Sequence, residues 1–148
     1  MVHLIKNRIP NHYLLLFSWI AAIFATGGSL FFSQVMHFVP CTLCWYQRIL
    51  MYPLVISLGI AYLHNDVSIR RYILPVSIPG FVLACYHYTI QMLPNVSTSQ
   101  FCSPNNPCTD KEFSILGFIT IPLMSATAFF LITLSMLLLK ANHQNEMK

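Results

Sequence analysis

Four of the five cysteines form two close pairs, Cys41 with Cys44 and Cys102 with Cys108. Two thiols this near in sequence can form and break a disulfide bond, and each cycle moves two electrons. Pro40 precedes the first pair and favours a helix start, which places Cys41 near the N-cap and Cys44 in the first turn. Unpaired amide groups and the helix dipole favour a thiolate there. The first pair therefore predicts redox chemistry.

One arginine follows the first pair, four residues after Cys44. Cys44 and Arg48 then share a helix face and lie ~6 Å apart along the axis. An ionisable residue inside a membrane span is costly and is a functional-site candidate. The alternative is that Arg48 extends to the lipid headgroups. With Cys44 one turn earlier, we favour a role in steadying a thiolate or an oxygen-bearing cofactor.

Five residues rich in turn formers separate Cys102 from Cys108. Such a segment can fold back and bring the two sulfurs together. A structural cross-link is the alternative, as in many secreted proteins. Because this loop is short and anchored by helices at both ends, a cross-link would add little. A small, exposed, proline-strained ring is instead readily attacked by another thiol, so we predict a redox-active pair.

Membrane spans are the elements that must hold these residues. Of 148 residues, 56% are hydrophobic and only 8% are charged, whereas a soluble domain carries about 25% charged residues. A helix needs about 20 apolar residues to cross a bilayer. Four stretches qualify, at about 13–36, 43–63, 72–93 and 113–139, with outer loops at about 37–42 and 94–112. Pro122 lies within the last stretch, where we expect a kink.

These lengths predict an all-α integral membrane protein, an antiparallel bundle of four transmembrane helices in a single domain over residues 1–148. The first apolar run is longer than the roughly 7–15 residues of a cleavable signal, so we expect it to remain as a span. The basic residues are scattered and not interleaved with aromatic residues, which argues against a nucleic-acid partner.

Basic residues gather on one predicted side of the bilayer. That side is flanked by Lys6, Arg8, Arg70, Arg71, Lys140 and Lys148, and the other only by Arg48 and Lys111. The positive-inside rule then predicts that both termini are cytoplasmic. Both cysteine pairs fall on the outer side, where disulfides form and persist.

A disulfide accepts two electrons only once, so turnover needs an electron acceptor. The sequence has no glycine-rich dinucleotide fingerprint. His87 is the one histidine well inside a span, while His37 and His64 lie at span ends, which argues against a haem held by two histidines. A lipid-soluble quinone beside Cys44 and Arg48 fits better, because a guanidinium can hydrogen-bond a quinone oxygen and stabilise developing negative charge.

The four paired cysteines could instead bind zinc, since a Cys-x-x-Cys opposite a second pair is a familiar zinc arrangement. The wider second spacing and the oxidising side argue against it, and we predict no metal site. Cys85 has no partner in sequence within the third predicted span, and we interpret it as a small hydrophobic residue.

The motifs resemble those of a known family. Gln34-Val35-Met36 followed by Pro40-Cys41-Thr42-Leu43-Cys44-Trp45-Tyr46-Gln47-Arg48 resembles the hallmark of the DsbB disulfide-bond formation proteins. The short second loop ending in Pro107-Cys108, followed by Gly117-Phe118-Ile119-Thr120-Ile121-Pro122, is similar to the BdbC branch. The resemblance covers essentially the whole chain.

The resemblance implies a quinone-dependent thiol oxidase. Cys102 and Cys108 match the loop disulfide that takes electrons from a DsbA-like or BdbD-like thioredoxin-fold partner, with Cys102 forming the mixed disulfide. Cys41 and Cys44 match the pair that reoxidises the loop. Cys44 matches the residue that meets the quinone, and Arg48 the quinone-site arginine. The loop cysteines lie much closer here than in better-known members, which leaves an interloop disulfide between Cys41 and Cys108 open.

Together these arguments predict an oxidoreductase of the cell membrane that supports disulfide formation in exported proteins. Its partners would be the outer thioredoxin-fold oxidant, the lipid bilayer and a quinone, either ubiquinone or menaquinone. Two other functions stay open. One is a structural membrane protein with static outer-loop disulfides, and the other is a metal-handling membrane protein.

Overall fold

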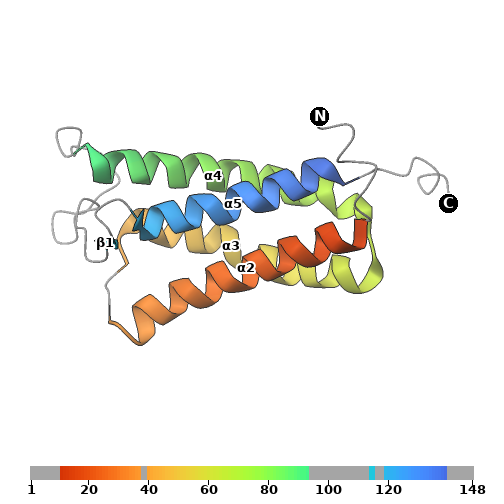
Figure 1. The fold of residues 1–148 in the computed structure, drawn as a ribbon, viewed down its shortest axis with the longest axis horizontal. Helices are drawn as coiled ribbons and strands as arrows, with labels where there is room; N and C mark the ends of the chain where they lie inside the picture. Colours follow the sequence, from red (N-terminus) through yellow and green to blue (C-terminus); the bar gives the residue numbers. More distant parts are fainter. Residues whose placement is uncertain (1–10, 38–39, 94–113, 116–118, 140–148) are drawn as a thin grey trace.

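A computed structural model describes residues 11–37, 40–93, 114–115 and 119–139 of the chain (Figure 1). Four long helices dominate it, α2 (Asn11–Gln34), α3 (Thr42–His64), α4 (Arg70–Met92) and α5 (Ile121–Leu138). A short 3₁₀ turn, η1 (Val67–Ile69), precedes α4. Strands β1 (Ser114–Ile115) and β2 (Ile119–Thr120) pair antiparallel, with Ser114 opposite Thr120 and Ile115 opposite Ile119.

The four helices run alternately up and down. The ends of α2 and α4 and the starts of α3 and α5 all lie at one end of the bundle (Figure 1). Each of the four helical segments is long and apolar enough to cross a membrane. The predicted bundle of four transmembrane helices is therefore confirmed, whereas the cytoplasmic placement of the termini stays a prediction.

The fourth helix begins later than predicted. Its expected span starts near residue 113, but α5 begins at Ile121, after the extended residue Thr120. Pro122 lies in the first turn of α5, where its missing N–H group costs no helical hydrogen bond. Pro122 therefore helps to start a helix, and the predicted kink at this residue was wrong.

The helices pack in a ring, α2 against α3, α3 against α4, α4 against α5 and α5 against α2. The centre of the ring is filled by fully buried side chains that include Leu15, Leu58 and Phe129. Large apolar side chains such as Ile56 and Leu63 point outward and are exposed. A surface this apolar is suited to lipid contact, which fits a multi-pass membrane protein.

The end of the bundle opposite the first cysteine pair is closed by polar contacts. Asn65 ends α3 in the left-handed conformation with φ of 50°. The Asp66 carboxylate accepts a hydrogen bond from the Ser68 amide at 2.9 Å, which caps η1. Arg70 at the start of α4 donates to the Leu139 carbonyl at 3.0 Å, so the start of α4 is joined to the end of α5.

Close packing of α4 on α5 depends on Gly80. A Cβ atom at this position would clash with the ring of Phe129, which is fully buried in the core. We expect Gly80→Ala to lower the free energy of unfolding by about 1–3 kcal/mol, the usual cost of overpacking. Thermal unfolding in detergent measures this loss.

Gly27 offers a matched control for that substitution, because a Cβ atom there meets nothing within 4 Å. Gly27→Ala should leave stability unchanged or slightly raised, since alanine is the better helix former. Equal effects of the two substitutions would show that Gly80 does not set the distance between α4 and α5.

Candidate functional site

The first cysteine pair lies at the start of α3. Cys41 is the N-cap residue, with the extended dihedral angles φ −69° and ψ 169°, and its carbonyl accepts a hydrogen bond from the Trp45 amide at 3.1 Å. Cys44 follows in the first turn. This is the helix start that the sequence predicts. The two sulfurs lie 3.3 Å apart, and both residues are free thiols.

Cys41 is the more secluded of the two thiols, with an exposed fraction of 7%. Its hydrogen bond with the Cys44 thiol lowers the pKa of Cys41 well below the ordinary thiol value, and burial opposes this shift. The ring of His87 lowers the same pKa further, through a hydrogen bond and its charge. Cys41 is therefore favoured as a thiolate.

A buried histidine from α4 completes the surroundings of Cys41. Nε2 of His87 lies 3.5 Å from the Cys41 sulfur. Nδ1 on the other side of the ring lies 3.1 Å from Nε2 of Gln47. His87 is only 2% exposed, and Gln47 is also buried. The site thus joins α3 to α4 through a chain of three polar side chains.

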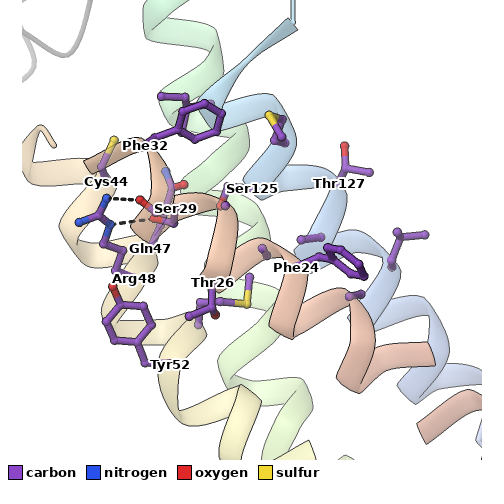
Figure 2. Close-up of a pocket in the computed structure, with 18 residues that line it drawn as sticks. Phe24, Thr26, Ser29, Phe32, Cys44, Gln47, Arg48, Tyr52, Ser125 and Thr127 are labelled. Atoms are coloured by element: carbon purple, nitrogen blue, oxygen red, sulfur yellow. Dashed lines mark hydrogen bonds between the residues drawn. The ribbon is translucent and has the colours of Figure 1, made fainter. Parts of the chain in front are cut away.

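Arg48 points into the bundle. Its Nε donates to the Ser29 hydroxyl and one terminal nitrogen donates to the Ser29 carbonyl, both at 2.8 Å. Figure 2 shows these two bonds reaching from α3 to α2. The guanidinium carbon lies 5.5 Å from the centre of the Trp45 ring. With 9% of Arg48 exposed, extension to the lipid headgroups is excluded in this conformation.

A cavity of about 280 Å³ lies beside Arg48, between α2, α3 and α5 (Figure 2). Most of its walls are apolar. The described residues that line it are Ala21, Phe24, Ala25, Thr26, Gly28, Ser29, Phe32, Cys44, Gln47, Arg48, Met51, Tyr52, Ile121, Met124, Ser125, Thr127, Ala128 and Leu131. Phe24 is also 77% exposed on the outside of the bundle. The cavity therefore reaches the face that lipid would cover.

The volume and the lining of the cavity would suit a quinone ring. An apolar cavity of about 150 Å³ accepts benzene, so this cavity has room for a substituted six-membered ring. Several polar side chains interrupt its walls. Among them are the Arg48 guanidinium and the Thr26 hydroxyl, whose buried oxygen has no hydrogen-bond partner among the described residues. A ring with carbonyl acceptors would suit both groups.

The remaining cysteines are not part of the described site. Cys102 and Cys108, with the loop predicted over 94–112, lie outside the described residues. Cys85 is exposed on the outward side of α4, apart from the Cys41 and Cys44 pair.

Sequence reasoning assigned no role to three neighbours of the site, His87, Gln47 and Ser29. A lone ionisable residue inside a span was the available signal for His87. Gln47 lies within the hallmark motif, but neither its residue type nor its position in the motif predicts the contact with His87. Ser29 was visible only as one of many small residues suited to close helix packing.

Ser29 holds the Arg48 guanidinium through its hydroxyl and its backbone carbonyl. Ser29→Ala removes the hydroxyl bond alone. We expect a severalfold weaker quinone interaction with an unchanged fold, because one hydrogen bond to a charged group contributes about 1.5–3 kcal/mol and the carbonyl bond remains. The apparent KM for quinone measures the change. Ser33→Ala, one turn later on α2 and outside the cavity lining, should have no effect.

Comparison with known proteins places this arrangement in a family. The model of "Disulfide bond formation protein DsbB" matches residues 11–139. The chain is 46% identical over 135 residues to "Disulfide bond formation protein C" of Bacillus subtilis, covering 91% of this chain and 96% of the relative. It is 45% identical over 134 residues to "Probable disulfide formation protein C" of Halalkalibacterium halodurans, covering 90% and 96%.

A "Probable disulfide formation protein" of Coxiella burnetii is 41% identical over 132 residues, covering 85% of this chain and 90% of the relative. No solved structure matches the chain significantly. The family model covers most of the chain, and these relatives match it along nearly their full lengths. The protein therefore belongs to the DsbB family of disulfide bond formation proteins.

Proposed function

We propose that the protein is a quinone-dependent thiol oxidase of the cytoplasmic membrane, built as one membrane domain. Membership of the family supports a thiol oxidase role in disulfide formation. The proposal that the electrons pass to a quinone rests on one observation. Cys44 and Arg48 line the same lipid-facing cavity, while Cys41 lies within 3.3 Å of Cys44 at the helix start.

The proposed electron path has three exchanges. A reduced thioredoxin-fold partner gives two electrons to the disulfide between Cys102 and Cys108 on the outer side, and the partner leaves with a disulfide. The loop dithiol then reduces the disulfide between Cys41 and Cys44, and the loop disulfide forms again. Finally the Cys41 and Cys44 thiols lose two electrons and two protons, and their disulfide is restored.

Arg48 is proposed to hold the electron acceptor beside Cys44. When bound, a quinone accepts two electrons and two protons. The guanidinium, fixed by Ser29, offers hydrogen bonds to a carbonyl oxygen and stabilises negative charge there without reorganising. The Thr26 hydroxyl, buried in the cavity wall and without a hydrogen-bond partner among the described residues, offers a further polar contact.

The redox potentials favour a quinone as acceptor. A DsbA-type partner has a potential of about −120 mV, so only a still more oxidising acceptor can regenerate its disulfide. For a two-electron couple, each ~30 mV changes the equilibrium about tenfold. A quinone supplies that drive, whereas a glutathione pool, at a lower potential, does not.

One observation supports the metal-handling alternative. The sulfurs of Cys41 and Cys44 and a ring nitrogen of His87 all lie within 4.8 Å of one another, close enough for one ion. Zinc analysis of the purified protein separates the two functions. Stoichiometric zinc together with no reducible disulfide would favour metal handling over thiol oxidation.

The proposed function is tested by mixing the purified protein with a reduced thioredoxin-fold partner and a soluble quinone. We expect one quinol for each partner disulfide formed, over many turnovers. Cys85→Ser serves as a matched control, because this exposed thiol lies outside the proposed path, and should retain full activity. Partner oxidation without quinol formation would contradict the proposal.

A further inference from the structure

Two cysteines and a buried histidine converge at the start of α3. The Cys41 and Cys44 sulfurs are 3.3 Å apart, and Nε2 of His87 on α4 lies 3.5 Å from the Cys41 sulfur. Thiolate sulfur and imidazole nitrogen are ligands that Zn²⁺ prefers in proteins. The sequence argues against a zinc site made of four cysteines, but this set of three residues needs neither cysteine of the second pair.

The spacing of the three ligand atoms is close to what a tetrahedral zinc ion requires. With Zn–S bonds of about 2.3 Å and a Zn–N bond of about 2.0 Å, two sulfurs lie ~3.8 Å apart and each lies ~3.5 Å from the nitrogen. Cys41 and His87 already have this separation. The Cys44 sulfur lies within 4.8 Å of a ring nitrogen of His87, so a modest rotation of this one side chain completes the set.

The charge of such a complex suits a buried site. Cys41 is 7% exposed and His87 is 2% exposed, and an unpaired charge is costly in such surroundings. Two thiolates cancel the charge of Zn²⁺, so the complex with a neutral imidazole has no net charge. A neutral complex also avoids strong repulsion by the Arg48 guanidinium, whose charge acts on Cys44.

Gln47 occupies the place of the outer partner that a zinc-bound histidine usually has. Its amide nitrogen lies 3.1 Å from Nδ1 of His87, on the side of the ring away from Cys41. When Nε2 binds a metal ion, Nδ1 carries the proton and an oxygen acceptor fixes the ring. A half-turn of the Gln47 amide exchanges its nitrogen and oxygen, and the oxygen then accepts this N–H group.

We propose that the reduced Cys41 and Cys44 pair binds one Zn²⁺ ion together with His87, and that this ion inhibits reoxidation of the pair. Binding moves no electrons, because Zn²⁺ replaces the two thiol protons and these pass to the medium. The disulfide form has no thiolate to offer, so the site exists only in the reduced protein. The inhibition rests on the proposed function, whereas the binding of zinc does not.

Inhibition follows because sulfurs bound to zinc are not free to join each other. Closing the disulfide takes one electron from each sulfur, forms the S–S bond and passes both electrons to the quinone. Zinc holds the sulfur lone pairs that this bond formation uses. We therefore expect zinc to slow quinol formation more strongly when reduced partner is raised, which populates the reduced pair, and less strongly when quinone is raised.

Zinc binding is measured on the full chain in detergent, without partner or quinone. Replacement of Cys85, Cys102 and Cys108 by serine leaves only the first pair. Zinc chloride is titrated without air against a chromophoric chelator. We expect one zinc ion per protein when the pair is reduced and none when it is oxidised. Equal binding by the two redox states, or no binding by the reduced state, would overturn the proposal.

Substitutions in the same background test the ligand set. His87→Phe, which keeps a ring in the same space, should weaken zinc binding more than ~100-fold, because loss of an outer partner alone costs about 10–100-fold. Gln47→Leu should fall within that smaller range. His64→Phe, at the other end of α3, should leave the affinity unchanged. Unchanged affinity in a folded His87→Phe protein would overturn the proposal, and Gln47→Leu decides the question if that variant does not fold.

Turnover of the native chain separates the two proposals. Zinc that binds the reduced pair but leaves quinol formation unchanged would contradict the proposed inhibition. Inhibition that does not depend on the concentration of reduced partner would also contradict it, by placing the ion away from the reduced pair. Failure of the proposed function would appear instead as no quinol from the native protein before any zinc is added.

Discussion

We expect Cys44→Ser to abolish quinol formation and to leave the bundle folded. Cys44 is the cysteine of the pair that lines the cavity, and in the proposed path the electrons reach the acceptor through its sulfur. A serine hydroxyl fills the same space but forms no disulfide with Cys41. We expect the rate to fall below about one thousandth of the native value, as is usual when a reacting nucleophile is removed.

The fold of this variant should be close to native, because the change is nearly isosteric at a half-buried position. Initial rates of quinol formation, with thermal unfolding in detergent on the same sample, measure both effects. A protein with static disulfides would behave oppositely. In that case the Cys44→Ser variant would unfold at a lower temperature with no loss of activity. This result would contradict the proposal that the protein is a thiol oxidase.

We expect Arg48→Met to raise the apparent KM for quinone about tenfold or more. The substitution keeps an unbranched side chain but removes the guanidinium, and a hydrogen bond to a charged group contributes about 1.5–3 kcal/mol. Each 1.4 kcal/mol is about a factor of ten in affinity. The KM for the reduced partner should not change, because Arg48 points into the bundle between α3 and α2.

Arg48→Lys tests whether charge alone is sufficient. Lysine keeps the positive charge but has no planar fork to bond both oxygens of Ser29, so an intermediate KM is expected. Arg71→Met, at the opposite end of the bundle, controls for the loss of a positive charge. An unchanged quinone KM in Arg48→Met would remove this residue from the quinone site.

The sequence predicts the parts of this site that depend on local spacing. Pro40 and the Cys-x-x-Cys motif indicate a helix start, and the structure begins α3 at Thr42. The apolar length of the second span places Arg48 inside the bilayer, and the structure buries it. The helix start and the depth of Arg48 depend only on helix geometry and on the length of the apolar stretch. Residues close together in the sequence specify both.

Contacts between helices could not be predicted in the same way. The pairing of His87 with Cys41 and that of Arg48 with Ser29 depend on how α4 and α2 are rotated about their axes. Apolar residues surround each span on nearly every side, so hydrophobic periodicity does not specify that rotation. The late start of α5 has a different cause, since residues 113–120 are apolar enough in sequence to continue a span, but Thr120 is extended and Pro122 lies in the first turn of the helix.

The central claim is that the Cys41 and Cys44 thiols deliver their electrons to a quinone in the adjoining cavity. The direct measurement is a single turnover without air, in which fully reduced protein with Cys102 and Cys108 replaced by serine receives one equivalent of quinone. We expect one quinol per protein, formed at the same rate as the two thiols disappear. Quinol that accumulates while both thiols persist, or thiols that persist with no quinol formed, would contradict the account.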